Sequence, residues 1–190
     1  KFRIIKYKPA IKPALKIKNV SKSFNGVPVL QNFNLNILPG SINGLLGENG
    51  SGKTTLFNLI LGNLKADEGE IYAKGSTLIS SMPIHERCKK FRISYVPQKT
   101  SLFLGLSCQD NIKGVAQLMM KDSRKVDEIC DRLLTEFSLL DVAKTKANDL
   151  SGGQKKKLSI ARSLISDPEI ILLDEIFAAL SPKIIETIKN

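Results

Sequence analysis

The chain has 190 residues, of which 42% are hydrophobic and 25% charged, and its formal net charge is +11. This length suits about one domain of roughly 100–200 residues. The composition is that of an ordinary globular protein, which excludes a disordered, collagen-like or disulfide-rich chain. No apolar run approaches the ~20 residues of a membrane-spanning helix, so any role at a membrane is expected to be that of a peripheral subunit.

The positive charge is concentrated near the N-terminus, where eight basic residues precede the first acidic residue, Glu48. Residues 1–14 include two prolines and are expected to form a basic tail ahead of a domain at 15–190. A nucleic-acid-binding protein more commonly spreads positive charge over a folded face, so no nucleic-acid partner is expected. An anionic membrane surface and solvent alone are both compatible with the tail.

Cysteine usage indicates a reducing compartment. Cys88, Cys108 and Cys130 are widely spaced, and the single histidine, His85, cannot complete a metal site with them. Free buried thiols are therefore expected. The chain carries no signal-peptide pattern and begins with Lys1 rather than Met, which leaves open a true start further upstream.

Strand patterns dominate the first forty-six residues. Leu15–Val20, with interleaved lysines, predicts an edge strand, and Val29–Ile37 predicts a second strand. Asn25-Gly26 between them is a hairpin turn signal. Pro39-Gly40 ends the second strand, and the apolar run Ile42–Leu46 predicts a short buried strand.

A glycine-rich loop follows that run and carries the first chemical motif. It fits the pattern G-x-x-x-x-G-K-[ST] in full, with apolar positions at helical spacing after it; its residues are Gly47, Glu48, Asn49, Gly50, Ser51, Gly52, Lys53 and Thr54. Such a loop turns backbone N–H groups toward phosphate oxygens, and the helix start adds positive charge. Lys53 is placed to reach the β- and γ-phosphates and Thr54 to ligate Mg²⁺, with Thr55 completing the nucleotide-binding set. A chance glycine-rich turn is the disfavoured alternative.

The rest of the chain alternates strand and helix patterns around a helical stretch. Helices are predicted at 82–91, near 126–137 with Ser123 as N-cap, at 155–166 and after Ser181-Pro182; strands are predicted at 68–72, 93–96 and 170–173. The region at about 100–148 is expected to be an inserted helical subdomain.

Two adjacent acids end the last predicted strand, Ile170–Leu173. Ligands bind at the carboxyl ends of strands in open α/β sheets. Asp174 is therefore a candidate to hold Mg²⁺, and Glu175 a candidate to polarise the attacking water. The alternative is that the acids simply form a turn that ends the strand, but such a turn accounts for one acidic residue better than for two adjacent ones.

A third motif identifies a family resemblance. The residues Leu150, Ser151, Gly152, Gly153 and Gln154, taken with the loop at 47–54 and the acids at 174–175, resemble the ATP-binding-cassette (ABC) ATPases. The resemblance implies an α/β fold, a P-loop NTPase core with an N-terminal antiparallel β subdomain and an inserted helical subdomain. It also implies a homodimer that pairs head to tail around two ATP molecules. In that dimer Ser151, Gly152, Gly153 and Gln154 face the γ-phosphate held by the other subunit.

Other residues acquire roles from the same resemblance. Phe24 matches the aromatic residue that stacks on adenine, although an ordinary strand phenylalanine is the alternative. Gln98 matches the glutamine that senses Mg²⁺ and the γ-phosphate. The implied catalytic set is Glu175, Gln98 and Lys53, the implied metal set is Thr54, Gln98 and Asp174, and the implied cofactors are ATP and Mg²⁺.

The stretch at 82–112 resembles more narrowly the ATPases of lipopolysaccharide export transporters, and ATPases of branched-chain amino-acid importers share parts of it. The implied function is ATP hydrolysis that drives transport across the inner membrane. The chain would act on its cytoplasmic face, bound to transmembrane permease subunits. Soluble cassettes that act on nucleic acid or the ribosome are disfavoured, because they usually carry two domains in one chain or a long coiled-coil insertion.

Three departures from the family pattern bear on catalysis. Ile176 replaces the usual proline, Ser181 replaces the usual aspartate, and no histidine follows His85 although the family has a switch histidine roughly thirty residues beyond the catalytic glutamate. The chain is expected to be either cut short before that histidine or a degenerate cassette that binds ATP and hydrolyses it poorly.

Overall fold

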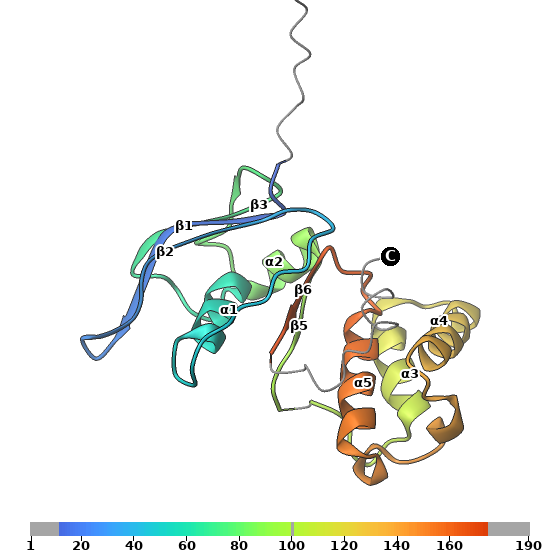
Figure 1. Cartoon of the computed structure of the whole chain (residues 1–190). Coiled ribbons are helices and arrows are strands. Elements are labelled where there is room, and N and C mark those ends of the chain that lie inside the picture. Colours follow the sequence, from blue (N-terminus) through green and yellow to red (C-terminus); the bar gives the residue numbers. More distant parts are fainter. Residues whose placement is uncertain (1–11, 100, 175–190) are drawn as a thin grey trace, which may run out of the picture. The chain divides into compact units, whose positions relative to one another are not determined.

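The computed structural model describes residues 12–99 and 101–174, and Figure 1 shows the arrangement of their helices and strands. The chain divides into two compact units, Lys1–Arg87 and Cys88–Asn190. The first unit contains an antiparallel sheet and a helix after the glycine-rich loop. The second contains a parallel strand pair and a helical bundle.

The sheet of the first unit has the strand order β2-β1-β3-β4. Its strands are β1 (Leu15–Phe24), β2 (Val27–Ile37), β3 (Glu68–Ala73) and β4 (Thr77–Leu78). The prediction of an edge strand at the start of β1 is wrong, because β1 pairs with β2 on one side and with β3 on the other. Its interleaved lysines mark the solvated face of the sheet, while Leu15 and Ile17 are buried on the other face.

The hairpin between β1 and β2 is confirmed. Asn25 has φ 50° and Gly26 has φ 78°, and two consecutive positive φ angles are the signature of the type I′ turn that suits the twist of paired strands. Phe24 is therefore the last residue of β1, directly before the turn.

The predicted strand at Ile42–Leu46 is wrong. These residues belong to neither of the two sheets of the described chain, and the side chains of Ile42 and Leu46 are 59% and 86% exposed. An apolar run becomes a strand only when another strand pairs with it, and residue type alone does not supply that partner.

Two helices follow in the first half of the chain. α1 (Lys53–Leu61) buries Leu56, Leu59, Ile60 and Leu61, and it ends at Gly62, whose φ is 90°. α2 (Ile84–Phe91) starts after Pro83, two residues later than predicted, and it spans the division between the units.

The second unit contains the parallel pair β5 (Ile93–Val96) and β6 (Ile170–Leu173), with Ile93 opposite Ile170 and Val96 opposite Leu173. Both strands lie where the sequence predicted them. Their carboxyl ends meet at one edge of the pair.

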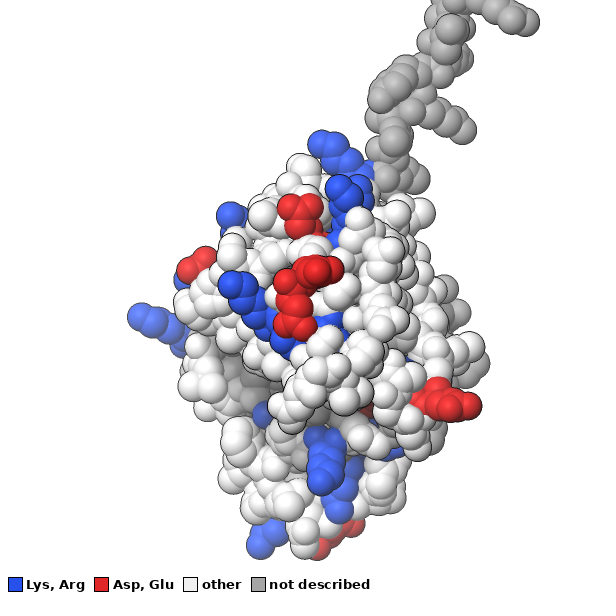
Figure 2. Space-filling model, turned by 90° about the vertical axis from the view of Figure 1, so that its left-hand side faces the viewer, with Lys and Arg blue, Asp and Glu red and all other residues white. Residues whose placement is uncertain are grey.

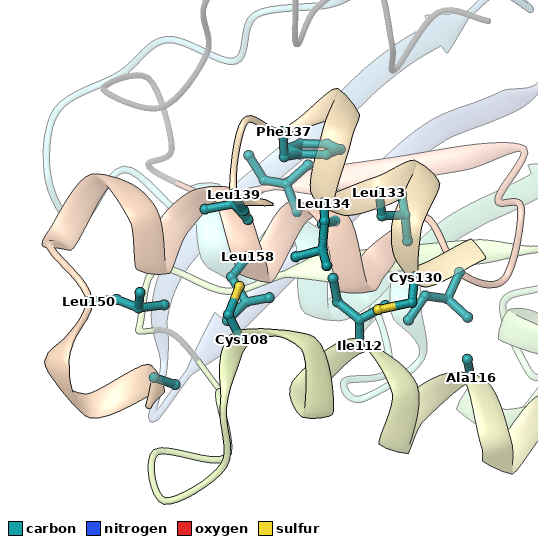
Figure 3. Packing of buried hydrophobic residues seen from close by; sticks show 14 of the residues in the cluster. Cys108, Ile112, Ala116, Cys130, Leu133, Leu134, Phe137, Leu139, Leu150 and Leu158 are labelled. Atoms are coloured by element: carbon teal, nitrogen blue, oxygen red, sulfur yellow. The ribbon is translucent and has the colours of Figure 1, made fainter. Parts of the chain in front are cut away.

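The helices of this unit enclose a core of their own. They are α3 (Cys108–Met119), α4 (Ser123–Glu136) and α5 (Gly152–Ser163), with short 3₁₀ turns η1 (Leu140–Val142) and η2 (Ala147–Asp149). Figure 3 shows Ile112, Leu134 and Leu158 from the three helices directed into the same buried cluster. The predicted amphipathic helix is confirmed, but its N-cap is Asp122, which accepts from the backbone N–H of Arg124 at 3.0 Å, and not Ser123.

All three cysteines are free, as predicted; Cys108 and Cys130 are buried and Cys88 is half-buried. Burial raises the pKa of the Cys108 and Cys130 thiols to about 11. Both thiols serve as small apolar groups of the helical core.

Candidate functional site

The glycine-rich loop has a backbone that favours glycine at several positions. Gly50 and Gly52 have φ angles of 83° and 92°, which L-amino acids with side chains rarely adopt. A Cβ at Gly47 would lie 2.5 Å from Ser51 Oγ, and one at Gly52 would lie 2.9 Å from Cγ1 of Val29 in β2. The loop therefore packs closely on itself and on β2.

The first turn of α1 gathers positive charge beside this loop. The N-cap, Gly52, has no side chain to cap the helix, and no acidic residue lies in the first turn. Lys53 Nζ donates to the carbonyl oxygens of Gly47 and Glu48, each at 2.7 Å. Thr54 and Thr55 also belong to this turn. A helix start of this kind, with an ammonium group against the loop, favours an anion.

Phe24 lies in the same unit at the end of β1 and is 42% exposed. Lys22 Nζ lies 5.5 Å from the centre of its ring and 2.6 Å from Asp67 Oδ1. The hydrogen bond from Lys22 lowers the pKa of the Asp67 carboxyl. An exposed ring with a nearby cation offers a surface for stacking.

In the second unit, the carboxyl edge of the β5–β6 pair carries two of the expected residues. Asp174 is buried and its backbone N–H donates to Val96 O at 3.0 Å. Gln98 follows two residues beyond β5 and is exposed. The parallel pairing thus brings the Gln98 segment and Asp174 to one edge, as the position of acids after an apolar strand suggests.

Tyr95 is a residue that sequence reasoning missed. Its hydroxyl donates to Asp174 Oδ2 at 3.2 Å. Burial, followed by the nearby charge of Asp174, raises the pKa of Tyr95 to about 12, so the phenol stays protonated and holds the carboxylate. The two residues are 79 apart, and no local pattern relates them.

The motif at 151–154 forms the start of α5. The predicted start of the helix at 155 is corrected, because α5 begins at Gly152 with Ser151 as the N-cap. Ser151 Oγ accepts from the backbone N–H of Gln154 at 3.2 Å, and Gln154 Oε1 accepts from the Ser151 N–H at 2.8 Å. This reciprocal capping box offsets the low helix propensity of two glycines in the first turn.

The expected site residues are thus distributed over the two units. Phe24 and residues 47–55 belong to the first, and Gln98, residues 151–154 and Asp174 belong to the second. Glu175, the expected catalytic acid, lies outside the described residues, as do Ile176 and Ser181. Within residues 12–99 and 101–174, no three His, Cys, Asp or Glu side chains cluster as metal ligands, and no helix is long and apolar enough to cross a membrane.

Charge on one face of the molecule is mixed. Figure 2 shows Lys and Arg side chains interspersed with Asp and Glu on that face rather than joined in one basic patch.

Comparison with known families gives a match to the ABC transporter model over residues 30–178. A probable ABC transporter ATP-binding protein of Azorhizobium caulinodans is 40% identical over 163 residues, which cover 86% of this chain and 57% of the relative. The lipopolysaccharide export system ATP-binding protein LptB of Escherichia coli is 37% identical over 179 residues, 93% of this chain and 73% of LptB. The chain thus spans a little over half the length of the first of these relatives.

Among solved structures, a dimeric ATP-binding cassette in a post-hydrolysis state with bound ADP and Pi is similar, with a TM-score of 0.77 and 32% identity. The alignment covers 92% of this chain and 79% of that one. This likeness confirms the α/β fold of the P-loop type that the sequence predicted.

Proposed function

Because this chain belongs to the ABC transporter family, we propose that it binds MgATP at residues 47–55 and hydrolyses it to drive transport. The observation that carries the proposal is the start of α1. There a glycine-rich loop, the Lys53 ammonium and a helix end without an acidic side chain lie together. A triphosphate is the anion that this combination suits.

Each binding role is proposed from the residue's place in its own unit. Lys53 exchanges its carbonyl partners in the loop for oxygens of the β- and γ-phosphates. The loop glycines, Glu48, Asn49 and Ser51 contribute through their backbone. Phe24 offers its exposed ring to the adenine.

The proposed metal ligands are the Thr54 hydroxyl, the Gln98 amide oxygen and the Asp174 carboxylate. Oxygen donors with few protein ligands suit Mg²⁺, which retains waters and phosphate oxygens. Bound Mg²⁺ supplies charge neutralisation on the phosphates. Tyr95 holds the Asp174 carboxylate in place through its hydroxyl.

The motif at the start of α5 is proposed to contact nucleotide held by a second copy. Ser151, Gly152, Gly153 and Gln154 present a helix N-terminus that carries a capping box between Ser151 and Gln154. Support comes from the similar cassette that was solved as a dimer. We propose a head-to-tail homodimer bound to transmembrane permease subunits, on the cytoplasmic face of the inner membrane.

Lipopolysaccharide export is the proposed transport process. The LptB of Escherichia coli is 37% identical over 179 residues, and the resemblance of residues 82–112 points to the same group. Import of branched-chain amino acids is the alternative, since ATPases of that group share parts of this stretch. Copurification of the chain with permease subunits of either system decides between them.

Removal of the Lys53 charge tests the nucleotide site. Lys53→Ala should weaken MgATP binding by about 10- to 100-fold, as expected for loss of a hydrogen bond to a charged group. Lys155→Ala is the matched control, because Lys155 Nζ also donates to a main-chain carbonyl that precedes its helix, Asn148 O in η2 at 2.8 Å. Unchanged affinity of the Lys53 variant in a fluorescence titration would contradict the assignment.

Replacement of Glu175 tests hydrolysis separately from binding. Glu175→Gln should retain MgATP, accumulate as an ATP-bound dimer and release phosphate about 10²–10⁴ times more slowly, because a carboxamide does not polarise the attacking water. Parent-like phosphate release by this variant would exclude Glu175 as the base. If the unsubstituted chain binds ATP but releases no phosphate, it is a nucleotide-binding module that does not hydrolyse ATP.

A further inference from the structure

Arg87 is a buried charged residue that the proposed mechanism does not use. Its side chain is only 1% exposed, and it is among the largest fully buried side chains of the described chain. A buried guanidinium requires partners for its N–H groups, since desolvation otherwise destabilises the fold.

Four of those partners are main-chain carbonyl oxygens. Nη1 donates to Leu59 O at 2.7 Å and to Ile60 O at 2.9 Å. Nη2 donates to Ser80 O at 2.7 Å, and Nε donates to Met82 O at 2.7 Å. Through these hydrogen bonds, the Arg87 side chain of α2 joins the end of α1 to the segment 80–82.

The two carbonyls on α1 belong to its last turn, where a helix leaves C=O groups without internal partners. No basic residue of α1 itself lies in that turn, although a cation there is favourable to the helix dipole. Arg87 supplies that cation from α2, which lies next to α1 in Figure 1.

Gly62 leaves room for this contact. A Cβ at Gly62 would lie 2.8 Å from Arg87 Nε and 3.0 Å from its Cζ. The guanidinium therefore packs directly across the residue that ends α1.

Both ends of α1 are glycines in the left-handed region, Gly52 with φ 92° and Gly62 with φ 90°. Glycine restricts the backbone less than any other residue, so neither flanking connection sets the direction of the helix by stiffness. The nine residues of α1 span only about 13 Å at 1.5 Å per residue. A tilt at its C-terminal end therefore moves the first turn, which carries Lys53.

We propose that Arg87 is a positioning residue for nucleotide binding, which acts by fixing the C-terminal end of the helix that carries the phosphate loop. The proposal rests on the proposed function, since it requires ATP to bind at residues 47–55. Along α1, Asn58 Nδ2 donates to Thr54 O at 2.9 Å, which ties the middle of the helix to the turn that holds the loop.

Two variants break the contact from its two sides. Arg87→Lys retains the charge but lacks the planar fork that reaches four carbonyls. Gly62→Ala inserts a methyl group against the guanidinium. Each should raise the Kd for MgATP about tenfold, the scale of coupling through packed neighbours.

Two controls separate positioning from general loss of stability. Gly40→Ala introduces a side chain at a comparable φ of 69° with nothing within 4 Å. Val126→Ala removes buried methyl groups from the helical core of the second unit. Both should leave the Kd for MgATP within about twofold of the parent, because neither site shares a partner with Arg87.

The experiment measures the Kd for MgATP of each variant at a temperature where circular dichroism shows it fully folded, with Lys53→Ala as reference. In turnover assays the Arg87 and Gly62 variants should raise KM and leave kcat unchanged. If Lys53→Ala weakens MgATP binding while Arg87→Lys and Gly62→Ala bind MgATP like the parent, the positioning role is overturned and the proposed function stands. Equal weakening by Val126→Ala also overturns it, and an unaffected Lys53→Ala overturns the proposed function itself.

Discussion

Two helices of this chain start beside a glycine-rich motif, and their first turns are built in opposite ways. α5 begins with a complete capping box, in which Ser151 and Gln154 bond each other's backbone N–H groups. α1 begins with Gly52, which has no side chain, and with Lys53 turned back to two loop carbonyls.

A helix N-terminus can be capped by its own side chains or can bind an anion, and the two helices differ in which of these they favour. A capping box satisfies helix donors internally, so the start of α5 is stable without a ligand. The start of α1 relies on backbone geometry and an ammonium group, so it gains most from an anion. We therefore expect substitutions at α1 to act on nucleotide affinity and those at α5 to act first on stability.

The largest expected effect comes from Gly52→Ala. Alanine at φ 92° is strained, and its Cβ would lie 2.9 Å from Val29 Cγ1, so the variant should lose about 2 kcal/mol of unfolding free energy and bind MgATP at least about tenfold more weakly. Denaturant unfolding and nucleotide titration measure the two losses.

Gly153→Ala is the matched control at α5. Apart from the backbone of its own helix, nothing lies within 4 Å of a Cβ built there, and its φ is not in the left-handed region. It should gain about 0.5 kcal/mol of unfolding free energy from better helix propensity, and the monomer should keep the parent affinity for MgATP. Equal losses at both glycines would erase the distinction between the two helix starts.

A smaller effect is expected from Ser151→Ala, which removes the side-chain oxygen that caps α5. The variant should lose about 1 kcal/mol of unfolding free energy. The MgATP affinity of the monomer should not change, whereas ATP-dependent dimer formation in size-exclusion chromatography should weaken. Weaker binding of MgATP by the monomer would contradict the assignment of this motif to nucleotide held by a second copy.

The smallest expected effect is that of Gln154→Glu. Glutamate retains the acceptor of the capping box and places a negative charge in the first turn, which should add about 0.3–1 kcal/mol of stability at low salt. Thermal unfolding at low and high salt tests this gain, which salt should reduce. A loss of stability would show that the amide of Gln154 has a further partner at α5.

Short-range features of the fold follow from sequence alone. The hairpin at Asn25-Gly26, the glycine-rich loop and the strands β5 and β6 were predicted, because turn geometry and apolar runs are encoded by neighbouring residues. The arrangement of Lys53 against the glycine-rich loop follows for the same reason. The motif of the loop fixes which backbone groups and side chains stand next to one another.

Features that depend on contacts between residues distant in the chain were determined only by the tertiary structure. It placed β1 between two strands, left Ile42–Leu46 outside both sheets of the described residues, and set Tyr95 against Asp174 and Arg87 against the end of α1. A buried arginine and an apolar run look the same in sequence whether or not such partners exist. Strand pairing and satisfied buried charge are properties of contacts between segments, so only the folded chain determines them.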